Sequence, residues 1–427
     1  MYVRGWPSTE AEVCSSPAVS ASVPCPRLTH TEEAAVDRVE LLADMMGAVR
    51  PDEVANSVQR ALENTVGGQS QILVIDYAQT RLMQLVVAPT AHRESFAVDG
   101  TVAGRAYTTG QAQEVVDEAG YRIWLPLLQG AHRIGVLEVR TPSEITPAQR
   151  AGIEAVAAVL AGVLPAVSLV SDAVSVTRRL SPMQLAAEIV WGLLPPLTFA
   201  DRDVCVAGIL EPCYDVGGDA FDYAVGGRVA RVALFDAVGH GLAASRLSSL
   251  TVAAYRNARR SGLDLVATAV SIDKVLRTQA PPNHFVTALL AELDLDTGRY
   301  RRISAGHPGE LLARGGKVIR QLAAPSWTPL GLGYLELGDP EVFVEQLEPG
   351  DHLLLYSDGA TEARSATGEL FGEGRLGDYL VKALADGLPA AETMRRLVSA
   401  LLQYQKDQLQ DDATAVLVGW RTDATPP

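Results

Sequence analysis

The sequence predicts an α+β protein with two folded domains joined by a helical connector. The chain has 427 residues, whereas a typical domain has about 150, so more than one domain is expected. Its composition is 48% hydrophobic and 20% charged, which excludes disorder along the whole length. Residues 35–168 place antiparallel strands between helices, whereas residues 200–421 contain short strands separated by glycine turns, with a few helices.

The charge balance limits the classes of partner. Lys and Arg number 36 against 51 Asp and Glu, for a formal net charge of −15. We therefore expect neither nucleic-acid binding nor attachment to an anionic membrane, unless a local basic patch exists. The four cysteines form no CxxC pair and are too few for a disulfide framework, which indicates a reducing, cytoplasmic location.

The N-terminal part is expected to begin with a flexible tail over residues 1–34, which are rich in Pro, Ser, Ala and Thr. In residues 35–168, alternating apolar positions predict strands and helical periodicity predicts helices. The strands are expected over residues 71–77, 82–87, 121–127 and 133–139. The helices are expected over residues 36–49, from Pro51, over residues 104–109 and from Pro147.

The last of these helices contains the most apolar window of the chain. This window runs over residues 155–170, with Glu154 before it and Pro165 inside it. It is short and rich in alanine for a membrane span. We interpret it as a buried or dimer-facing helix rather than a membrane segment.

Residues 169–199 are interpreted as a helical, coiled-coil-like connector. Apolar residues recur there with the 4-3-4-3-4 spacing of a coiled-coil seam, at Val176, Leu180, Met183, Ala187, Val190 and Leu194. Ser181-Pro182 interrupts the seam, although this pair also suits the start of a helix. The connector is either an ordinary amphipathic linker or a signalling helix that carries a change in a sensory dimer to the next domain.

Residues 200–421 are expected to form the second domain, followed by a short tail over residues 422–427. Apolar runs predict strands over residues 204–210, 229–235, 288–293, 353–356 and 413–420. Helical periodicity predicts helices over residues 242–260, 263–279 and 390–409.

Carboxylates recur near strand ends: Asp219 directly after Gly217-Gly218, Asp222 three residues later, Asp236 at the end of an apolar run, Asp358 directly before Gly359, and the pair Asp411-Asp412 directly before the last strand. A single aspartate at a strand end is usually a turn former. Several in one domain favour carboxylates that converge on one sheet edge, where they would repel one another unless cations neutralised them. Oxygen ligands select Mg²⁺ or Mn²⁺ over zinc. Two such ions, about 4 Å apart, can activate a bridging water for attack on phosphorus. The pattern predicts metal-assisted phosphoester hydrolysis.

The segments around these acids carry six motifs in a fixed order. They are Glu211-Pro212 with Val216-Gly-Gly-Asp219 and Phe221-Asp222, Asp236-Ala-Val-Gly-His-Gly241, Phe285-Val-Thr-Ala288, Ala305-Gly-His-Pro308, Tyr356-Ser-Asp-Gly359 with Glu362-Ala-Arg364, and Asp411-Asp-Ala-Thr414. Together they resemble the SpoIIE/RsbU-type phosphatases, the bacterial branch of the type 2C-like (PPM) serine/threonine phosphatases. The resemblance implies an α-β-β-α sandwich that binds two Mn²⁺ or Mg²⁺ ions at one end of its sheets.

The resemblance also implies a role for each matching residue. Asp236 would bridge both ions, with the backbone carbonyl of Ala237 as a further ligand. Asp219 would hold one ion, largely through water, while Asp358 and Asp411 would complete the other. The catalytic set is thus Asp219, Asp236 and Asp358.

Several neighbouring residues keep two possible roles. Asp412 is expected to orient the ligands, although the sequence cannot separate it from Asp411 as the ligand. Asp222 is expected to support the ligands without binding an ion. His240 and His307 could donate a proton to the leaving serine oxygen, but a structural role in capping the glycine-rich turns is favoured.

A second resemblance covers residues 35–168. Gly104-Arg-Ala-Tyr-Thr-Thr-Gly110, Trp124-Leu-Pro-Leu-Leu128 and Ile134-Gly-Val-Leu-Glu-Val139 are similar to motifs of the GAF family of sensor domains. GAF domains bind small molecules or dimerise. The resemblance therefore implies a homodimer and a small-molecule or protein signal, with an empty dimerisation module as the alternative.

The phosphatase resemblance implies a phosphorylated anti-anti-sigma factor as substrate, whose dephosphorylation lets it sequester an anti-sigma kinase and free a sigma factor.

Two other hypotheses compete with this function. Gly217-Gly-Asp-Ala-Phe221 is similar to the signature of diguanylate cyclases, but Ala220 stands where those enzymes have an acid, and Asp358 would be left unexplained. A catalytically inactive, phosphatase-like binding module is the more serious alternative.

Overall fold

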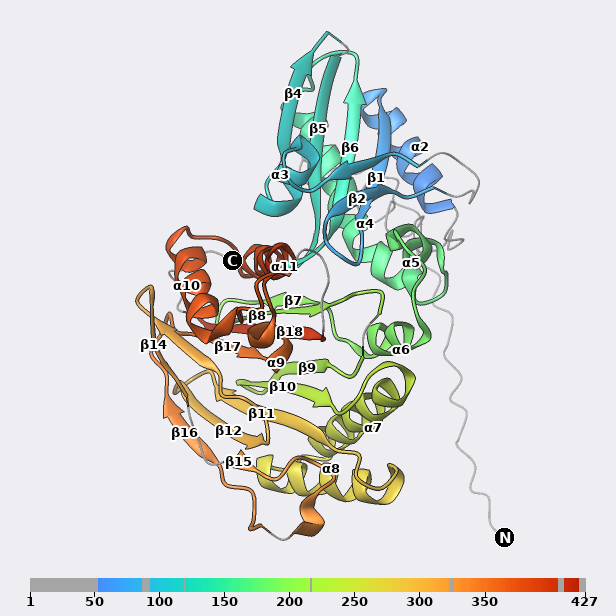
Figure 1. Ribbon diagram of the computed structural model, residues 1–427. Helices are drawn as coiled ribbons and strands as arrows, with labels where there is room; N and C mark the ends of the chain where they lie inside the picture. The colour runs from blue at the N-terminus through green and yellow to red at the C-terminus, as the bar shows by residue number, and fades with distance from the viewer. Residues whose placement is uncertain are drawn as a thin grey trace, which may run out of the picture.

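A computed structural model of the chain describes residues 53–86, 93–118, 120–215, 217–322, 326–335, 337–405 and 411–421. These residues form three six-stranded sheets, one in the N-terminal part and two in the C-terminal part (Figure 1). The expected tails over residues 1–34 and 422–427, the helix over residues 36–49 and Pro51 lie outside the described residues.

The N-terminal sheet is antiparallel throughout, in the order β3-β2-β1-β6-β5-β4. Its strands are β1 (Gln69–Ile75), β2 (Arg81–Gln84), β3 (Ser95–Ala97), β4 (Gln113–Asp117), β5 (Gly120–Gln129) and β6 (His132–Thr141). The sequence predicted β1, β2, β5 and β6. It did not predict the edge strands β3 and β4, because both are short and the Gln-Glu-Val-Val-Asp segment of β4 alternates weakly.

Helices cover both faces of this sheet. On one face, α2 (Val54–Val66) and α4 (Pro147–Ser168) pack with the sheet into a single core, while α3 (Val102–Thr109) packs on the other. A capping box formed by Thr146 and Gln149 starts α4. Of the helices in the described ranges, α4 alone is long and apolar enough to cross a membrane, and half of its apolar window is buried inside the protein. The buried face agrees with the interpretation of α4 as a core helix.

The connector is helical, as expected, but it does not form one coiled-coil-like helix. It consists of two short helices, α5 (Ala173–Arg178) and α6 (Leu185–Leu193). Helix α5 ends at Arg178, with Arg179 already extended, and Pro182 disfavours a helical conformation in Ser181 beyond it. The helix start expected at Ser181 is also wrong, because Gln184 is the N-cap of α6. Within the same chain, Ala187 and Val190 pack against Leu210.

The C-terminal part contains two sheets. The first has the order β15-β12-β11-β10-β9, with β16 also pairing β12. Its strands are β9 (Ala220–Gly226), β10 (Val229–Ala237), β11 (Val286–Asp294), β12 (Arg299–Ala305), β15 (Ser326–Trp327) and β16 (Phe343–Gln346). The second has the order β14-β13-β17-β18-β8-β7. Its strands are β7 (Thr198–Ala200), β8 (Val204–Glu211), β13 (Leu311–Arg314), β14 (Lys317–Gln321), β17 (His352–Tyr356) and β18 (Ala413–Trp420).

These two sheets pack face to face between two layers of helices (Figure 1). Residues such as Phe221 and Leu234 of the first sheet share one core with Val416 of the second. The first sheet is covered by α7 (Gly241–Arg260) and α8 (Leu265–Gln279). The second is covered by α10 (Gly372–Ala385) and α11 (Ala390–Tyr404), and the short helix α9 (Asp358–Glu362) follows β17. The layers are therefore helix, sheet, sheet and helix, as the sequence predicted.

The N-terminal and C-terminal parts are in direct contact. Arg133 of β6 forms an ion pair with Glu392 of α11, with 3.2 Å between Nη1 and Oε2. Beside the connector, the ring of Tyr77 lies 4.9 Å from that of Trp191 on α6. Polar and aromatic contacts thus fix how the first sheet sits on the second domain.

Candidate functional site

Strand pairing brings Asp219 and Asp236 to the same end of the first sheet. Ala220, the first residue of β9, pairs with Phe235 of β10 in antiparallel register. Asp219 immediately precedes that pair and Asp236 immediately follows it, so the two carboxylates are neighbours across the ladder.

The second sheet repeats this arrangement. Tyr356, the last residue of β17, pairs with Ala415 near the start of β18. Asp358 lies just beyond the end of β17, and the Asp411-Asp412 pair lies just before β18. The acids that the sequence singled out therefore come from matching ends of four strands in two sheets.

Asp412 ties the two sheets together at this end. Its carboxylate accepts hydrogen bonds from the backbone N–H groups of Gly217 (2.7 Å to the nearer oxygen), Gly218 (2.7 Å) and Asp219 (3.2 Å). These bonds use the oxygens of Asp412 to hold the loop before β9, which suits an orienting residue. Asp411, whose Oδ1 accepts the N–H of Asp412 at 2.9 Å, is more exposed and is the better candidate ligand of the pair.

Asp412→Ala is expected to destabilise the metal-free protein by about 3 kcal/mol, because three buried N–H groups lose their acceptor. Asp411→Ala removes an exposed carboxylate and is expected to leave stability unchanged while weakening Mn²⁺ binding. Urea unfolding in EDTA, together with calorimetric Mn²⁺ titration of both variants, checks this division. The assignment is wrong if Asp411→Ala destabilises the protein as much as Asp412→Ala does.

A close backbone approach places Ala237 beside the same loop. A Cβ atom added to Gly218 would lie only 2.3 Å from the carbonyl oxygen of Ala237, so position 218 has room only for glycine. Ser248 of α7 donates a hydrogen bond to the carbonyl of Gly218 and anchors the loop from the helix side. The Ala237 carbonyl, which the sequence analysis expected to be a ligand, thus packs directly on the loop that carries Asp219.

Mutual repulsion dominates the electrostatics of this cluster. Burial, followed by repulsion from Asp236 and Asp412, raises the pKa of Asp219 well above its usual range. Burial, followed by repulsion from Asp358 and Asp411, raises the pKa of Asp236 to about 7. Partial burial, followed by repulsion from Asp411, raises the pKa of Asp358. The charged groups that act most strongly on each of these carboxyls are other carboxyls, which indicates a site built for cations.

The donor set fits the two divalent ions that the resemblance implies. All the candidate ligands are oxygens, as Mg²⁺ and Mn²⁺ prefer. Asp219 is 2% exposed, and its Oδ2 forms no hydrogen bond with any described residue. Within the described ranges, no three His, Cys, Asp or Glu side chains are already arranged to hold an ion. Uncompensated carboxylates repel one another, so the ions themselves would draw these side chains together, with water completing the coordination.

His307 links the two sheets behind the acids. Its Nδ1 lies 2.8 Å from the hydroxyl of Thr287, and its Nε2 lies 3.1 Å from the carbonyl of Tyr356. The same Thr287 hydroxyl lies 3.4 Å from Asp236 Oδ2. Burial lowers the pKa of His307 to about 4, so the ring is neutral near pH 7. These contacts indicate a structural role, as the sequence analysis favoured, but as a bridge between the sheets and not as a cap of a glycine-rich turn.

The expectations for His240 as a cap and for Asp222 as a support of the ligands are wrong. His240 occupies the N-cap position of α7, but its exposed side chain makes no capping hydrogen bond. Asp222 does not support the acidic cluster. Its carboxylate is bound by Arg256 at 2.8 and 3.1 Å and by Arg259 at 3.2 Å, so it anchors β9 to α7.

The sequence analysis missed three hydroxyl groups. Thr287 contacts both Asp236 and His307, while Ser357 and Thr414 lower the pKa of Asp219 and so offset part of its rise. Each of the three lies inside a motif that also contains an acid or pairs with one. The pattern that would have identified them is a Ser or Thr that lies in the same motif as a candidate aspartate or pairs with one.

Comparisons with known proteins find relatives of the C-terminal part of the chain. The SiaA-PP2C domain of Pseudomonas aeruginosa aligns with 55% of this chain and 94% of its own, at 21% identity and a TM-score of 0.46. Phosphoserine phosphatase RsbU of Bacillus subtilis (strain 168) is 25% identical over 241 residues, which are 56% of this chain and 70% of RsbU. Stage II sporulation protein E of the same organism is 27% identical over 207 residues, 48% of this chain but only 24% of that protein. Residues 226–421 match the family described as Stage II sporulation protein E (SpoIIE). This part of the chain is a SpoIIE/RsbU-type phosphatase domain.

Proposed function

We propose that the protein is a serine/threonine protein phosphatase that uses two Mn²⁺ or Mg²⁺ ions and acts on a phosphorylated anti-anti-sigma factor. The observation that carries the chemistry is the set of aspartates from both sheets, which repel one another and include the unpartnered oxygen of Asp219. The substrate class rests on the sequence resemblance and on the similarity to a phosphoserine phosphatase.

In this mechanism the bound ions supply a deprotonated water and neutralise charge on the phosphoryl oxygens. Asp236 would hold both ions, with the Ala237 carbonyl beside it. Asp219 would hold one ion from the first sheet, and Asp358 and Asp411 would hold the other from the second. Asp412 keeps the loop of Asp219 in register with these ligands through its three backbone hydrogen bonds.

The proposal includes regulation by a GAF-like N-terminal domain in a cytoplasmic homodimer. A contact path supports the regulation. Tyr77, in the turn after β1, packs against Trp191 of α6, and the indole N–H of Trp191 donates to the carbonyl of Cys213 at 2.8 Å. The backbone N–H of Leu180 donates to the hydroxyl of Tyr214 at 2.9 Å. Cys213 and Tyr214 belong to the β8–β9 loop that continues to Gly217 and Asp219, so these contacts connect the first domain to the loop that carries Asp219.

Hydrolysis of p-nitrophenyl phosphate by the full-length protein with Mn²⁺, Mg²⁺ or EDTA tests the chemistry. We expect turnover with either ion and none in EDTA. A phosphoserine protein substrate distinguishes a strict substrate requirement from a dead enzyme. If neither substrate is hydrolysed and calorimetry detects no Mn²⁺ binding, the protein is instead an inactive, phosphatase-like binding module.

A further inference from the structure

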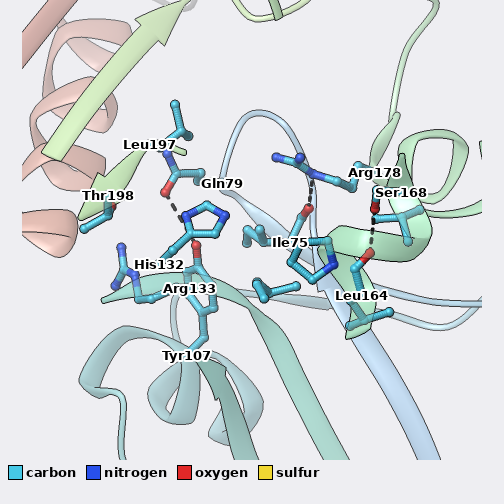
Figure 2. A pocket seen from close by; sticks show the side chains of 13 residues that line it. Ile75, Gln79, Tyr107, His132, Arg133, Leu164, Ser168, Arg178, Leu197 and Thr198 are labelled. Carbon is cyan, nitrogen blue, oxygen red and sulfur yellow. Dashed lines mark hydrogen bonds between the residues drawn. The ribbon is translucent and has the colours of Figure 1, made fainter. Parts of the chain in front are cut away.

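A cavity of about 220 Å³ lies where the N-terminal domain meets the phosphatase domain (Figure 2). Its walls come from β6, from the ends of α4 and α5, and from Leu197 and Thr198 at the start of the phosphatase domain. It is separate from the acidic cluster, since none of the candidate metal ligands lines it. Binding sites for small molecules often lie at such domain interfaces.

One wall carries a buried cation with an unused donor. Arg133 is 7% exposed, and its guanidinium lies over the ring of Tyr107, 4.6 Å from the ring centre. Its Nη1 contacts Glu392 at 3.2 Å and the carbonyl of Thr108 at 3.3 Å. Its Nη2 is buried and forms no hydrogen bond with any described residue. A buried N–H donor without a partner is costly, so a ligand that accepted from it would be stabilised.

A second cation lies on the other side of His132 (Figure 2). Arg178 donates from Nε to the carbonyl of Ile75 at 3.0 Å, and among the described residues no carboxylate lies within ion-pair distance of it. Asp76 is close enough to feel its charge, but the oxygens of Asp76 already accept hydrogen bonds from Thr80 and Arg81.

The cavity is therefore positive as well as partly apolar. None of the described residues that line it is acidic. Burial, followed by the charges of Arg178 and Arg133, lowers the pKa of His132 to about 4, so this ring is neutral near pH 7. Ile134, Leu164 and Val174 add apolar surface to the same walls.

We propose that this cavity binds a small amphipathic carboxylate, whose carboxylate group is held by the guanidinium groups of Arg133 and Arg178. Its apolar part would lie against Ile134, Leu164 and Val174. A cavity of about 150 Å³ holds benzene, so a ligand of about ten non-hydrogen atoms fits. Inorganic phosphate fits the charge but would leave oxygens against apolar walls, which is unfavourable.

Gln79 supports a ligand role for this cavity. It has a φ of +54°, a left-handed conformation that favours glycine, and it lies in the turn between β1 and β2. Its side chain lines the cavity, and its Oε1 lies 3.5 Å from the hydroxyl of Tyr107. Gln79→Gly relieves the backbone and removes the amide, so it is expected to keep the fold intact while weakening ligand binding.

A ligand here would contact both domains at once. Arg133 would pair with the ligand and with Glu392 of the phosphatase domain, and Thr198 of β7 also lines the cavity. The binding event needs no phosphatase activity, and only its regulatory consequence rests on the proposed function. Calorimetry therefore tests the site even if the proposed reaction is wrong.

The test is calorimetric titration of the full-length protein with benzoate and with 4-methyl-2-oxopentanoate. Neutral benzamide and inorganic phosphate serve as comparison ligands. We expect both carboxylates to bind and benzamide and phosphate to bind more weakly. Arg178→Gln is expected to weaken carboxylate binding by about tenfold or more, since a charge-assisted hydrogen bond is lost. Arg178 is the better target because Arg133 also carries the interdomain ion pair.

Arg179→Gln is the matched control, because this neighbour pairs with Glu188 instead of lining the cavity. It should leave carboxylate binding unchanged, and thermal unfolding without ligand verifies that both variants fold. The proposal is overturned if neither carboxylate binds the parent protein, or if Arg178→Gln binds as tightly as the parent. Equal binding of phosphate and benzoate would also overturn it, since the site would then be a simple anion site.

Discussion

Asp236→Asn is expected to lower kcat for phosphoester hydrolysis by about a thousandfold or more while the protein stays folded. Lewis-acid stabilisation by bound ions contributes several kcal/mol, and each 1.36 kcal/mol is about tenfold in rate. Asp236 lies at the end of β10, where Asp358 and Asp411 of the other sheet act on it most strongly among the charged groups. In the proposed mechanism Asp236 would hold both ions, and an amide would be a much poorer ligand. Calorimetric titration should show that Mn²⁺ binding is lost together with turnover.

The same substitution should not destabilise the metal-free protein. The pKa of Asp236 is raised to about 7 in the fold, so its ionised form is disfavoured there relative to the unfolded chain. For this group the linkage relation gives stability that is full at acid pH and declines as the pH rises toward 7. Asparagine does not ionise, so the variant does not lose this stability as the pH rises. In EDTA at pH 8 it should therefore unfold at the parent temperature or above it. Asp378→Asn, an exposed aspartate on α10, is the control and should change neither rate nor stability. Retained turnover in Asp236→Asn, or a lower melting temperature in EDTA, would contradict the assignment.

The sequence predicted most acids of the site because they lie beside apolar strands that are recognisable on their own, whereas β9, which follows Asp219, was not predicted. Asp236 follows the run over residues 232–235, and antiparallel pairing then determines its neighbours. Asp412 was expected to orient the ligands, but the contacts through which it acts could not be predicted, because its bonds to Gly217 and Gly218 cross from one sheet to the other. No local pattern encodes a contact between residues almost 200 positions apart.

The connector could not be predicted for a different reason. Its apolar pattern was clear, but two different structures fit that pattern. Apolar residues at heptad spacing suit a dimeric coiled coil, but they suit equally a short helix that packs on its own chain. In the structure Ala187 and Val190 cover Leu210 of β8. Val176, from the same predicted seam, is exposed on α5. The spacing specified an apolar face, and only the tertiary structure shows what covers it.

Glu392→Ala is expected to destabilise the full-length protein by about 3–5 kcal/mol, the usual cost of leaving a buried charge unpaired. Glu392 is 1% exposed and lies at the contact between the two domains. Its Oε1 accepts from Arg395 and Arg396 at 2.8 Å each, and its Oε2 accepts from Arg395 at 2.9 Å and Arg133 at 3.2 Å. Arg395 keeps a second carboxylate, Asp99, at 2.7 Å. Among the described residues, Arg133 has no other carboxylate within ion-pair distance. The substitution therefore leaves the buried charge of Arg133 without a partner.

Acid pH should reproduce part of this loss in the parent protein. Burial alone would raise the pKa of Glu392, but hydrogen bonds and attraction from Arg395 outweigh it and hold the pKa below its usual range. A carboxyl with a lowered pKa stabilises the fold above the pKa it has when unfolded, and that contribution disappears as the pH falls through its folded value. Denaturant unfolding of the parent, Glu392→Ala and Glu392→Gln between pH 7 and pH 3 measures both effects.

Glu369→Ala is the matched control, because its pair with Arg375 is exposed and its loss should be undetectable. The difference between the parent and Glu392→Ala should shrink toward pH 3, since protonation removes the charge that the substitution removes. A difference that stays constant with pH would show that Glu392 acts through packing, and that the ion pair with Arg133 does not hold the domains together.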